Sequence, residues 1–295
     1  MASLRDLKRR ILSVKSTRKI TKAMKMIAAV RLRKAQEAIE SARPYAVKLH
    51  EALSNLALRI EGKKPPLLQQ KDKEIKKVEL LVITSDRGLC GGFNSNILRY
   101  AERYRKEKVK DFKCSICIIG RKGWEYFQAR GVPVRKQYLG VFDDLSYENS
   151  QKISEEIINE YLNETFDRVD LIYNEFKSAV SQQVVHETLL PVQPLDVDSL
   201  QNHGLTFVQS DYDYEPNKED LLESILPRYF ATQIYRAFLE SIASEHGARM
   251  TAMENATNNA TDMIDSLTLQ FNRARQAAIT TELMEIIGGA EALKA

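Results

Sequence analysis

The sequence predicts an α/β protein in which long N- and C-terminal helices form an antiparallel two-helix coiled coil and flank one central, open, Rossmann-like α/β domain. Three observations predict this fold. Each end of the 295-residue chain carries an apolar heptad repeat, the repeats run far beyond an ordinary helix of about 11 to 12 residues, and short apolar runs alternate with helical segments between them. We therefore divide the chain into a first arm (1–60), a central domain (75–195) and a second arm (218–290).

The first arm contains two apolar series that recur every seven residues and predict a helix over about 3–59. One series is apolar or Thr throughout, and the other is interrupted only by Arg18 and Lys25. At ~1.5 Å per residue the helix is about 85 Å long, so it is expected to span or reach through something, although Pro44 allows a bend. The two series are Leu4, Ile11, Arg18, Lys25, Leu32, Ile39, Ala46 and Leu53, and Leu7, Val14, Thr21, Ala28, Ala35, Ala42, Leu49 and Leu56.

The second arm carries an alternation of three and four residues that predicts a helix over about 218–288, roughly 105 Å long. Pro227 lies near its start, so either the straight helix begins there or the helix bends there. The series is Leu239, Ile242, His246, Arg249, Met253, Ala256, Ala260, Met263, Leu267, Gln270, Ala274, Ala277, Thr281 and Met284.

The central segment alternates short apolar runs with helical segments, which is typical of an open sheet with helices packed on it. The stretches 62–77 and 196–217 are predicted to be linkers. The predicted strands cover about 78–84, 114–119, 132–138, 169–176 and 183–189, and the predicted helices cover about 95–108, 124–130 and 147–166.

Composition argues against several classes of protein. With 43% hydrophobic and 28% charged residues, the chain is expected to fold rather than stay disordered. No run approaches the ~20 apolar residues of a membrane span. The start, MASLRDLKRR, lacks the apolar core of a secretory signal, although its basic amphipathic character also resembles an import sequence.

Three cysteines, Cys90, Cys114 and Cys117, are too few for a disulfide scaffold and indicate a reducing compartment. Cys114 and Cys117 form a CxxC pair, but they lie in an apolar strand, where residues three apart point to opposite faces. No second CxxC or His pair completes a zinc site, so buried strand cysteines are favoured over a functional pair.

The glycines Gly88, Gly91 and Gly92 follow a strand and precede a helix, where nucleotide-binding proteins place a phosphate loop. Their spacing is not GxGxxG and no Gly-Lys-Ser or Gly-Lys-Thr follows, so we favour a tight structural turn, with Asp86 and Arg87 available for an ion pair or a partner contact. The histidines and adjacent acids have no catalytic or metal-binding spacing, so no active site, cofactor or metal is expected. They are His50, His186, His203 and His246, and Asp143, Asp144, Glu155 and Glu156.

The net charge of +4 hides an asymmetry between the arms. Residues 1–34 carry twelve Lys or Arg and one acid, whereas residues 250–295 carry three basic and six acidic groups. The first helix is therefore expected to seek an acidic partner surface, unless it merely pairs with the more acidic second helix.

A second apolar stripe on the first helix, Ile20, Met24 and Ile27, predicts a contact besides the coiled-coil mate, and methionine suits a contact that repacks. The alternative is a wider core against the same helix. The second helix has a slim surface of alanines and uncharged polar residues, which fits either rotation inside a collar or close coiled-coil packing. These residues are Ala256, Ala260, Ala274, Ala277 and Ala278, with Asn255, Thr257, Asn258, Asn259 and Thr261.

Three separated motifs give the chain a specific resemblance over essentially its whole length. They are LRDLKRRILSVKSTRKITKAMKMIAA, SDRGLCGGFN, and SEHGARMTAMENATNNA with NRARQAAITTELMEIIGGAEAL. With them the chain resembles the gamma-subunit family of F-type ATP synthases, differing only in details such as Arg121 and Lys122. The cysteine-bearing insert of chloroplast members is absent, so the resemblance implies a bacterial source without thiol control.

The resemblance implies a non-catalytic rotor shaft that transmits torque between proton flow through a membrane ring of c subunits and the catalytic sites of three alpha and three beta subunits. It places the protein peripherally at the cytoplasmic face of the bacterial inner membrane. It implies that Met24 and Lys25 meet an acidic lever of beta, and that Arg249, Gln276 and Thr280 contact beta loops. The foot of the coiled coil would contact epsilon and the c ring through Arg43, Tyr45, Tyr212 and Glu215.

Two rival functions remain. A coiled-coil nucleic-acid-binding protein would use the basic helix on phosphates, although the acidic second helix and the α/β domain argue against it. A small-molecule enzyme would use the glycine turn as a nucleotide site.

Overall fold

The computed structural model describes residues 3–60, 65–68, 75–108, 112–142, 145–193, 214–215 and 217–292, with side chains described as far as residue 290. The chain divides into two compact units. Residues 29–248 form one unit, and the two chain ends, 1–28 and 249–295, form the other. No helix in the described part of the chain is both apolar enough and long enough to cross a membrane.

Two long helices form the arms, α1 (Leu4–Ala57) and α6 (Lys218–Ala292). Pro44 and Pro227 lie inside these helices, so the expectation that the second helix could begin at Pro227 is wrong. The starts are capped: the backbone N–H of Asp220 donates to Asn217 Oδ1 over 2.8 Å, which satisfies one of the free amides of the first turn.

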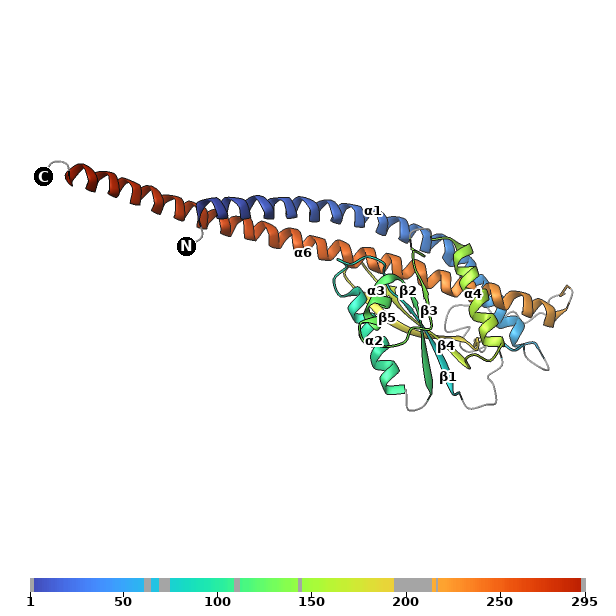
Figure 1. Cartoon of the computed structure of the whole chain (residues 1–295). Coiled ribbons are helices and arrows are strands. Elements are labelled where there is room, and N and C mark those ends of the chain that lie inside the picture. The colour runs from blue at the N-terminus through green and yellow to red at the C-terminus, as the bar shows by residue number, and fades with distance from the viewer. Residues whose placement is uncertain are drawn as a thin grey trace. The chain divides into compact units, whose positions relative to one another are not determined.

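The central sheet has the strand order β3-β2-β1-β4-β5. β1 pairs in parallel with β2 and β4, β2 pairs in parallel with β3, and β4 and β5 form an antiparallel edge (Figure 1). The strands are β1 (Lys77–Ile83), β2 (Lys113–Ile119), β3 (Lys136–Tyr138), β4 (Arg168–Phe176) and β5 (Gln182–Leu190), and the shorter helices are α2 (Phe93–Lys108), α3 (Arg121–Gln128) and α4 (Tyr147–Leu162). The predicted open α/β fold is therefore confirmed.

One local boundary is wrong: helix α3 begins at Arg121, three residues before the predicted start at about 124. The reason is Gly120, whose φ of 97° reverses the chain directly after β2. A Cβ at Gly120 would lie 2.0 Å from the carbonyl oxygen of Thr84, so only glycine fits there.

Both faces of the sheet are covered within residues 29–248. On one face Leu81 and Leu171 pack in a core with α4 and with the parts of α1 and α6 that belong to this unit. On the other face Leu80 and Ile172 pack with α2 and α3. Cys117 belongs to the first core and Cys114 packs against the second, which confirms that the two cysteines point to opposite faces.

Asp170 on β4 holds a buried polar cluster in this unit. Its carboxylate accepts hydrogen bonds from Arg168 Nη2 at 2.9 Å, Tyr104 Oη at 3.0 Å and Thr188 Oγ1 at 2.9 Å, and His186 Nε2 lies 3.3 Å away. Burial by itself would raise the pKa of Asp170, but the close approach of His186 and the charge of Arg168 outweigh it, so the pKa is lowered. The cluster ties α2 to β4 and β5.

Candidate interaction surfaces of the helical arms

The two chain ends pair as antiparallel helices. Lys25 Nζ forms an ion pair with Glu254 Oε1 at 2.6 Å, and one turn away the hydroxyls of Thr21 and Thr257 are 2.8 Å apart. Residue numbers that fall on α1 while they rise on α6 define an antiparallel register. Lys25, which interrupts the apolar series, therefore sits in the seam because it finds a carboxylate on the facing helix.

The predicted seam of α1 is confirmed, since Leu7, Thr21 and Ala28 are buried and no seam position of this helix is exposed. On α6 the predicted seam alternates between two sets of positions, and the set that contains Met263 is wrong by one residue. Ile264 is 6% exposed while the predicted Met263 is 53% exposed. Because an α-helix has 3.6 residues per turn, a seam can be followed by steps of three and four residues in either order. The predicted series ran through Ala256, which is more apolar than its neighbour Thr257, and its later positions, including Met263, followed from that step.

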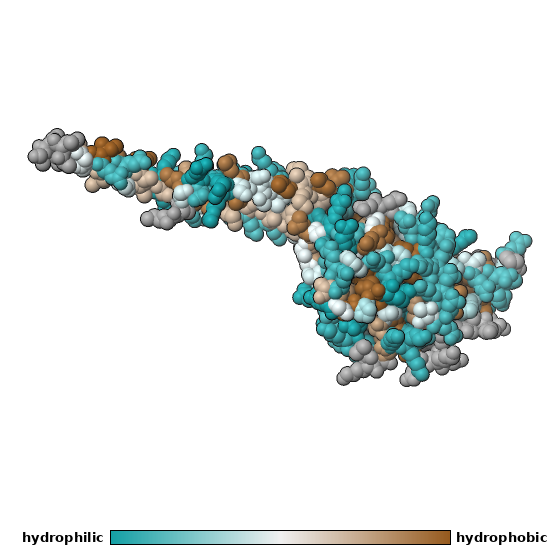
Figure 2. Space-filling model, viewed as in Figure 1, coloured by the Kyte–Doolittle hydropathy of each residue, from teal (hydrophilic) through white to brown (hydrophobic). Residues whose placement is uncertain are grey.

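The outer face of α1 carries exposed apolar side chains, as Figure 2 shows along the arm. Leu12, Ile20 and Ile27 are each more than half exposed, at 60%, 58% and 56%. The second stripe therefore does not widen the core against α6, except at Met24, which is half-buried. Basic residues such as Lys19 surround these apolar groups, so the face presents both apolar area and positive charge.

The end of α6 extends beyond its partner helix. Because Thr21 faces Thr257, the antiparallel register places Leu4, the first residue of α1, opposite about Ala274. Every side chain from Ile279 to Ala290 is exposed. The exposed residues of this end include the large apolar groups Ile279, Leu283, Met284, Ile286 and Ile287.

The implied beta-contact residues fall into different environments. Gln276 and Thr280 are exposed on the last part of α6, where Thr280 Oγ1 donates to the Gln276 carbonyl at 2.9 Å. Arg249 is only 8% exposed, in agreement with its place in the seam series, although the resemblance implies a contact with beta. Lys25 is half-buried against Glu254, so a partner carboxylate would compete with that ion pair.

The glycine segment after β1 forms a turn that internal hydrogen bonds hold. The backbone N–H of Ser85 donates to Asn94 Oδ1 at 3.0 Å, and Asn94 Nδ2 donates to Ser85 Oγ at 2.7 Å, which ties α2 to the end of β1. Gly91 has a φ of 57°, a left-handed conformation that glycine adopts without strain. Gly88 is half-buried and Gly92 is exposed.

Helix α6 packs close to this turn and to strand β4. Ser244 Oγ donates to the Asn174 carbonyl at 3.1 Å, and a Cβ at Gly247 would come within 3.3 Å of Ala179. The turn and the helix also share a small apolar cluster of Cys90, Phe93 and Ala248. These contacts support a structural turn and leave a nucleotide reading of the glycines without support in the geometry.

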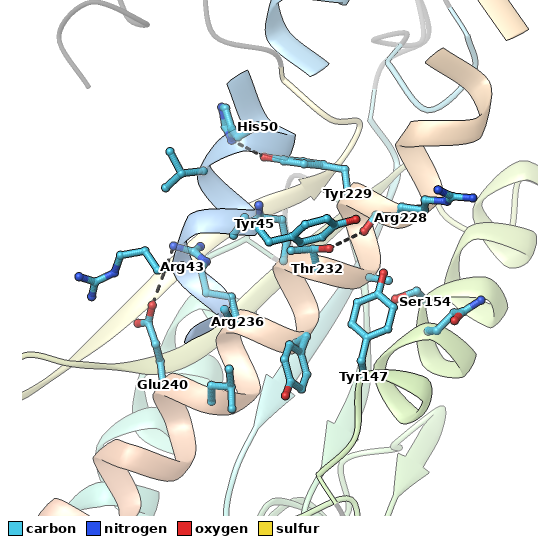
Figure 3. Close-up of a pocket in the computed structure, with 18 of the residues that line it drawn as sticks. Arg43, Tyr45, His50, Tyr147, Ser154, Arg228, Tyr229, Thr232, Arg236 and Glu240 are labelled. Carbon is cyan, nitrogen blue, oxygen red and sulfur yellow. Dashed lines mark hydrogen bonds and ion pairs between the residues drawn. The ribbon is translucent and has the colours of Figure 1, made fainter. Parts of the chain in front are cut away.

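The foot region has an open groove of 1240 Å³ between α1, α4 and α6 (Figure 3). Arg43 and Tyr45, two of the predicted foot contacts, lie on its rim and are exposed. Tyr229 and Thr232 form part of its floor, and Tyr229 Oη lies 2.9 Å from His50 Nδ1. Of the other two foot residues, Glu215 is exposed outside the groove lining and Tyr212 lies outside the described residues, as do His203, Asp143 and Asp144.

Comparison with known proteins gives consistent matches. The family model described as ATP synthase matches residues 3–293. The ATP synthase gamma chain of Trichlorobacter lovleyi is 49% identical, with all of both chains covered. A central-stalk chain of the Tetrahymena thermophila mitochondrial ATP synthase is 30% identical with a TM-score of 0.60, covering 80% of this chain and 99% of that one. A chain of the Euglena gracilis mitochondrial ATP synthase shares the fold at a TM-score of 0.70 and 21% identity, covering 98% of this chain and 94% of that one.

Proposed function

The chain belongs to the ATP synthase gamma-chain family, and from this membership we propose that it is the non-catalytic central-stalk subunit of an F-type ATP synthase. In this role it transmits torque between proton flow through the membrane part of the complex and ATP chemistry in the surrounding subunits. Neither rival function, nucleic-acid binding or small-molecule catalysis, receives support from the matches.

The proposal rests on the surfaces of the paired chain ends. It offers two different surfaces, a basic and apolar outer face on α1 and the single-helix end of α6 with its exposed apolar side chains. A shaft with unlike sides presents a different surface to each surrounding subunit as it turns. That asymmetry is what a rotor needs in order to hold three otherwise equal catalytic sites in different states.

The partners we propose are three alpha and three beta subunits around the arm, and epsilon and the c ring at the foot. Met24 and Lys25 would meet an acidic lever of beta, with the lever carboxylates competing with Glu254 for Lys25. Gln276 and Thr280 are exposed and available to beta loops, whereas Arg249 needs a local rearrangement to reach one.

The foot contacts we propose are Arg43, Tyr45, Tyr212 and Glu215. Of these, Arg43, Tyr45 and Glu215 are exposed, which supports a contact role. The protein would then be held peripherally at the cytoplasmic face of a bacterial inner membrane through its complex. Gly88, Gly91 and Gly92 would be structural, and no cofactor is required of this chain.

Reconstitution tests the proposal. The full chain is mixed with alpha and beta subunits of the same complex, and complex formation and ATP turnover are measured. We expect a stable complex whose turnover depends on this chain. If the chain neither assembles with these subunits nor changes their turnover, the stalk function is wrong.

A matched pair of variants tests the outer face of α1. Ile20→Glu places a charge on this face, and Val180→Glu places the same charge on an exposed apolar residue of the β4–β5 turn that is 79% exposed. Neither side chain is buried, so both variants are expected to fold. We expect Ile20→Glu to reduce coupled turnover and Val180→Glu to leave it unchanged. Equal effects would remove the outer face of α1 from the contact.

A further inference from the structure

One row of side chains on α6 fixes this helix to the central domain. Arg236, Ser244 and Ala248 are spaced by multiples of four residues, so they form one inclined row over about 18 Å of helix at ~1.5 Å per residue. Their partners come from three segments of the domain, namely β5, β4 and the glycine turn before α2. All these residues belong to the unit of residues 29–248.

Ser244 makes a fully buried polar contact in the middle of this row. Its Oγ donates to the Asn174 carbonyl of β4 at 3.1 Å, and the residue is 0% exposed. Asn174 Nδ2 in turn donates to the Phe93 carbonyl at 3.4 Å, which extends the connection to the start of α2. No solvent reaches this site to replace the bond, so turning the helix would leave a buried hydroxyl unpaired.

Arg236 supplies a second polar contact, two turns before Ser244. Its Nη2 lies 2.8 Å from Glu187 Oε2 on β5, and Tyr173 Oη donates to Oε1 of the same carboxylate at 3.2 Å. The carboxylate is therefore held from β4 as well as from α6. Both contacts lie off the helix axis, about 5–6 Å out at the level of the side chains, where they resist rotation of the helix about that axis.

Close packing continues the row beyond Ser244. A Cβ at Gly247 would lie 3.3 Å from Ala179 in the turn between β4 and β5, so the helix backbone approaches this turn closely. Ala248 packs with Cys90 and Phe93. The contacts of α6 with the domain therefore continue to the last residue of this unit, 248.

Helix α1 meets the sheet core elsewhere along its length. Its described residues in that core begin at Leu49, near the C-terminal end of the helix. Leu32 and Ala35 are also buried, but they belong to the seam series of α1. The row on α6 is therefore placed to set the rotation of the helix pair on the sheet.

We propose that Arg236 and Ser244 are positioning residues that fix the rotational setting of α6 on the central sheet, so that torque passes between helix and domain without loss. This assignment rests on the proposed function, because it names the joint through which a stalk subunit would pass torque. Neither residue would touch nucleotide or protons. Both would act through the geometry of α6, whose helix continues to Ala292.

Two matched double variants test the joint. Arg236→Ala with Ser244→Ala removes both polar contacts. The control, Arg103→Ala with Ser241→Ala, removes an exposed arginine of α2 and another buried hydroxyl of α6. Ser241 is 2% exposed, and its Oγ has no hydrogen-bond partner among the residues that the structure describes, so its loss should not change the setting of the helix.

The measurement is proton transport per ATP hydrolysed, in the complete complex reconstituted into vesicles. We expect Arg236→Ala with Ser244→Ala to retain ATP hydrolysis and to transport fewer protons per ATP, because a helix that turns on the sheet still turns with the surrounding subunits. The control should keep the wild-type ratio. Arg236→Lys with Ser244→Ala retains a positive charge opposite Glu187 and should recover part of the ratio. A lysine variant as uncoupled as the alanine variant would remove Arg236 from the joint.

The outcomes separate the joint from the stalk function. If the wild-type complex transports protons and the alanine variant has the same ratio as the control, the joint is wrong and the stalk function stands. Equal losses of hydrolysis and transport in the alanine variant would show that these residues only stabilise the fold, which also overturns the joint. If the wild-type chain supports no coupled turnover, the stalk function falls and the joint falls with it.

Discussion

Replacing Ile264 by Ala tests the register of the paired chain ends. This side chain is 6% exposed in the seam, so the substitution removes buried apolar atoms and leaves a cavity. In a fully buried domain core, such a substitution lowers the free energy of unfolding by about 2–5 kcal/mol. We expect a loss of about 2 kcal/mol here, because a two-helix seam closes around a cavity more easily than a core does. The matched change, Met263→Ala on the neighbouring residue, removes a side chain that is 53% exposed and should cost less than about 0.5 kcal/mol.

The measurement is hydrogen exchange of the backbone amides in the two chain ends, because loss of the seam frees these segments before the central domain unfolds. In Ile264→Ala we expect amides near Thr21 and Thr257 to exchange about thirtyfold faster, which corresponds to about 2 kcal/mol. Faster exchange in Met263→Ala than in Ile264→Ala would restore the register predicted from the sequence and refute the one described here.

Two further predictions concern the central domain. Asp170→Asn leaves Arg168 without its buried counter-ion and should cost about 3 kcal/mol at pH 7. The lowered native pKa of Asp170 means that its stabilisation is present above the ordinary carboxyl pKa of about 3.9 and is lost as the pH falls through the native value, so urea midpoints of wild type and variant should converge on acidification. A gap that does not narrow as the pH falls below about 3.9 would contradict this assignment. Gly120→Ala places a Cβ against the Thr84 carbonyl and should lower the melting temperature by several degrees. Gly131 also has a positive φ, but a Cβ there meets nothing within 4 Å, so Gly131→Ala should lower the melting temperature less. Equal losses would show that backbone strain, not the close approach to Thr84, dominates.

The sequence was sufficient for the fold because its signals are periodic. The α1 series holds at every seam position, including Thr21, whose hydroxyl meets Thr257. Strands such as β1 are short apolar runs buried on both sides, so hydrophobicity alone locates them. Short elements were less clear: β3 has three residues, fewer than any periodicity needs, and α3 begins at Arg121 because of a glycine conformation that no apolar pattern reports.

The candidate contacts were less accessible to sequence analysis, because a contact role depends on what the chain itself already covers. Lys25 and Arg249 look alike in the heptad pattern, as charges at apolar positions. In the structure Lys25 is half-buried in an ion pair with Glu254, and Arg249 is almost fully buried. Ile20 looked like possible core and is exposed.

The groove at the foot illustrates the same limit more strongly. Arg43 and Arg228 are 185 residues apart in the sequence (228 minus 43), and nothing in either local pattern marks them as a pair. They face one groove only because α1 and α6 run antiparallel, a register that also brings His50 to Tyr229. The heptad repeat that builds the shaft therefore also decides which distant charges share a surface, and an error of one residue in either helix would turn one of these arginines by about 100° away from the other.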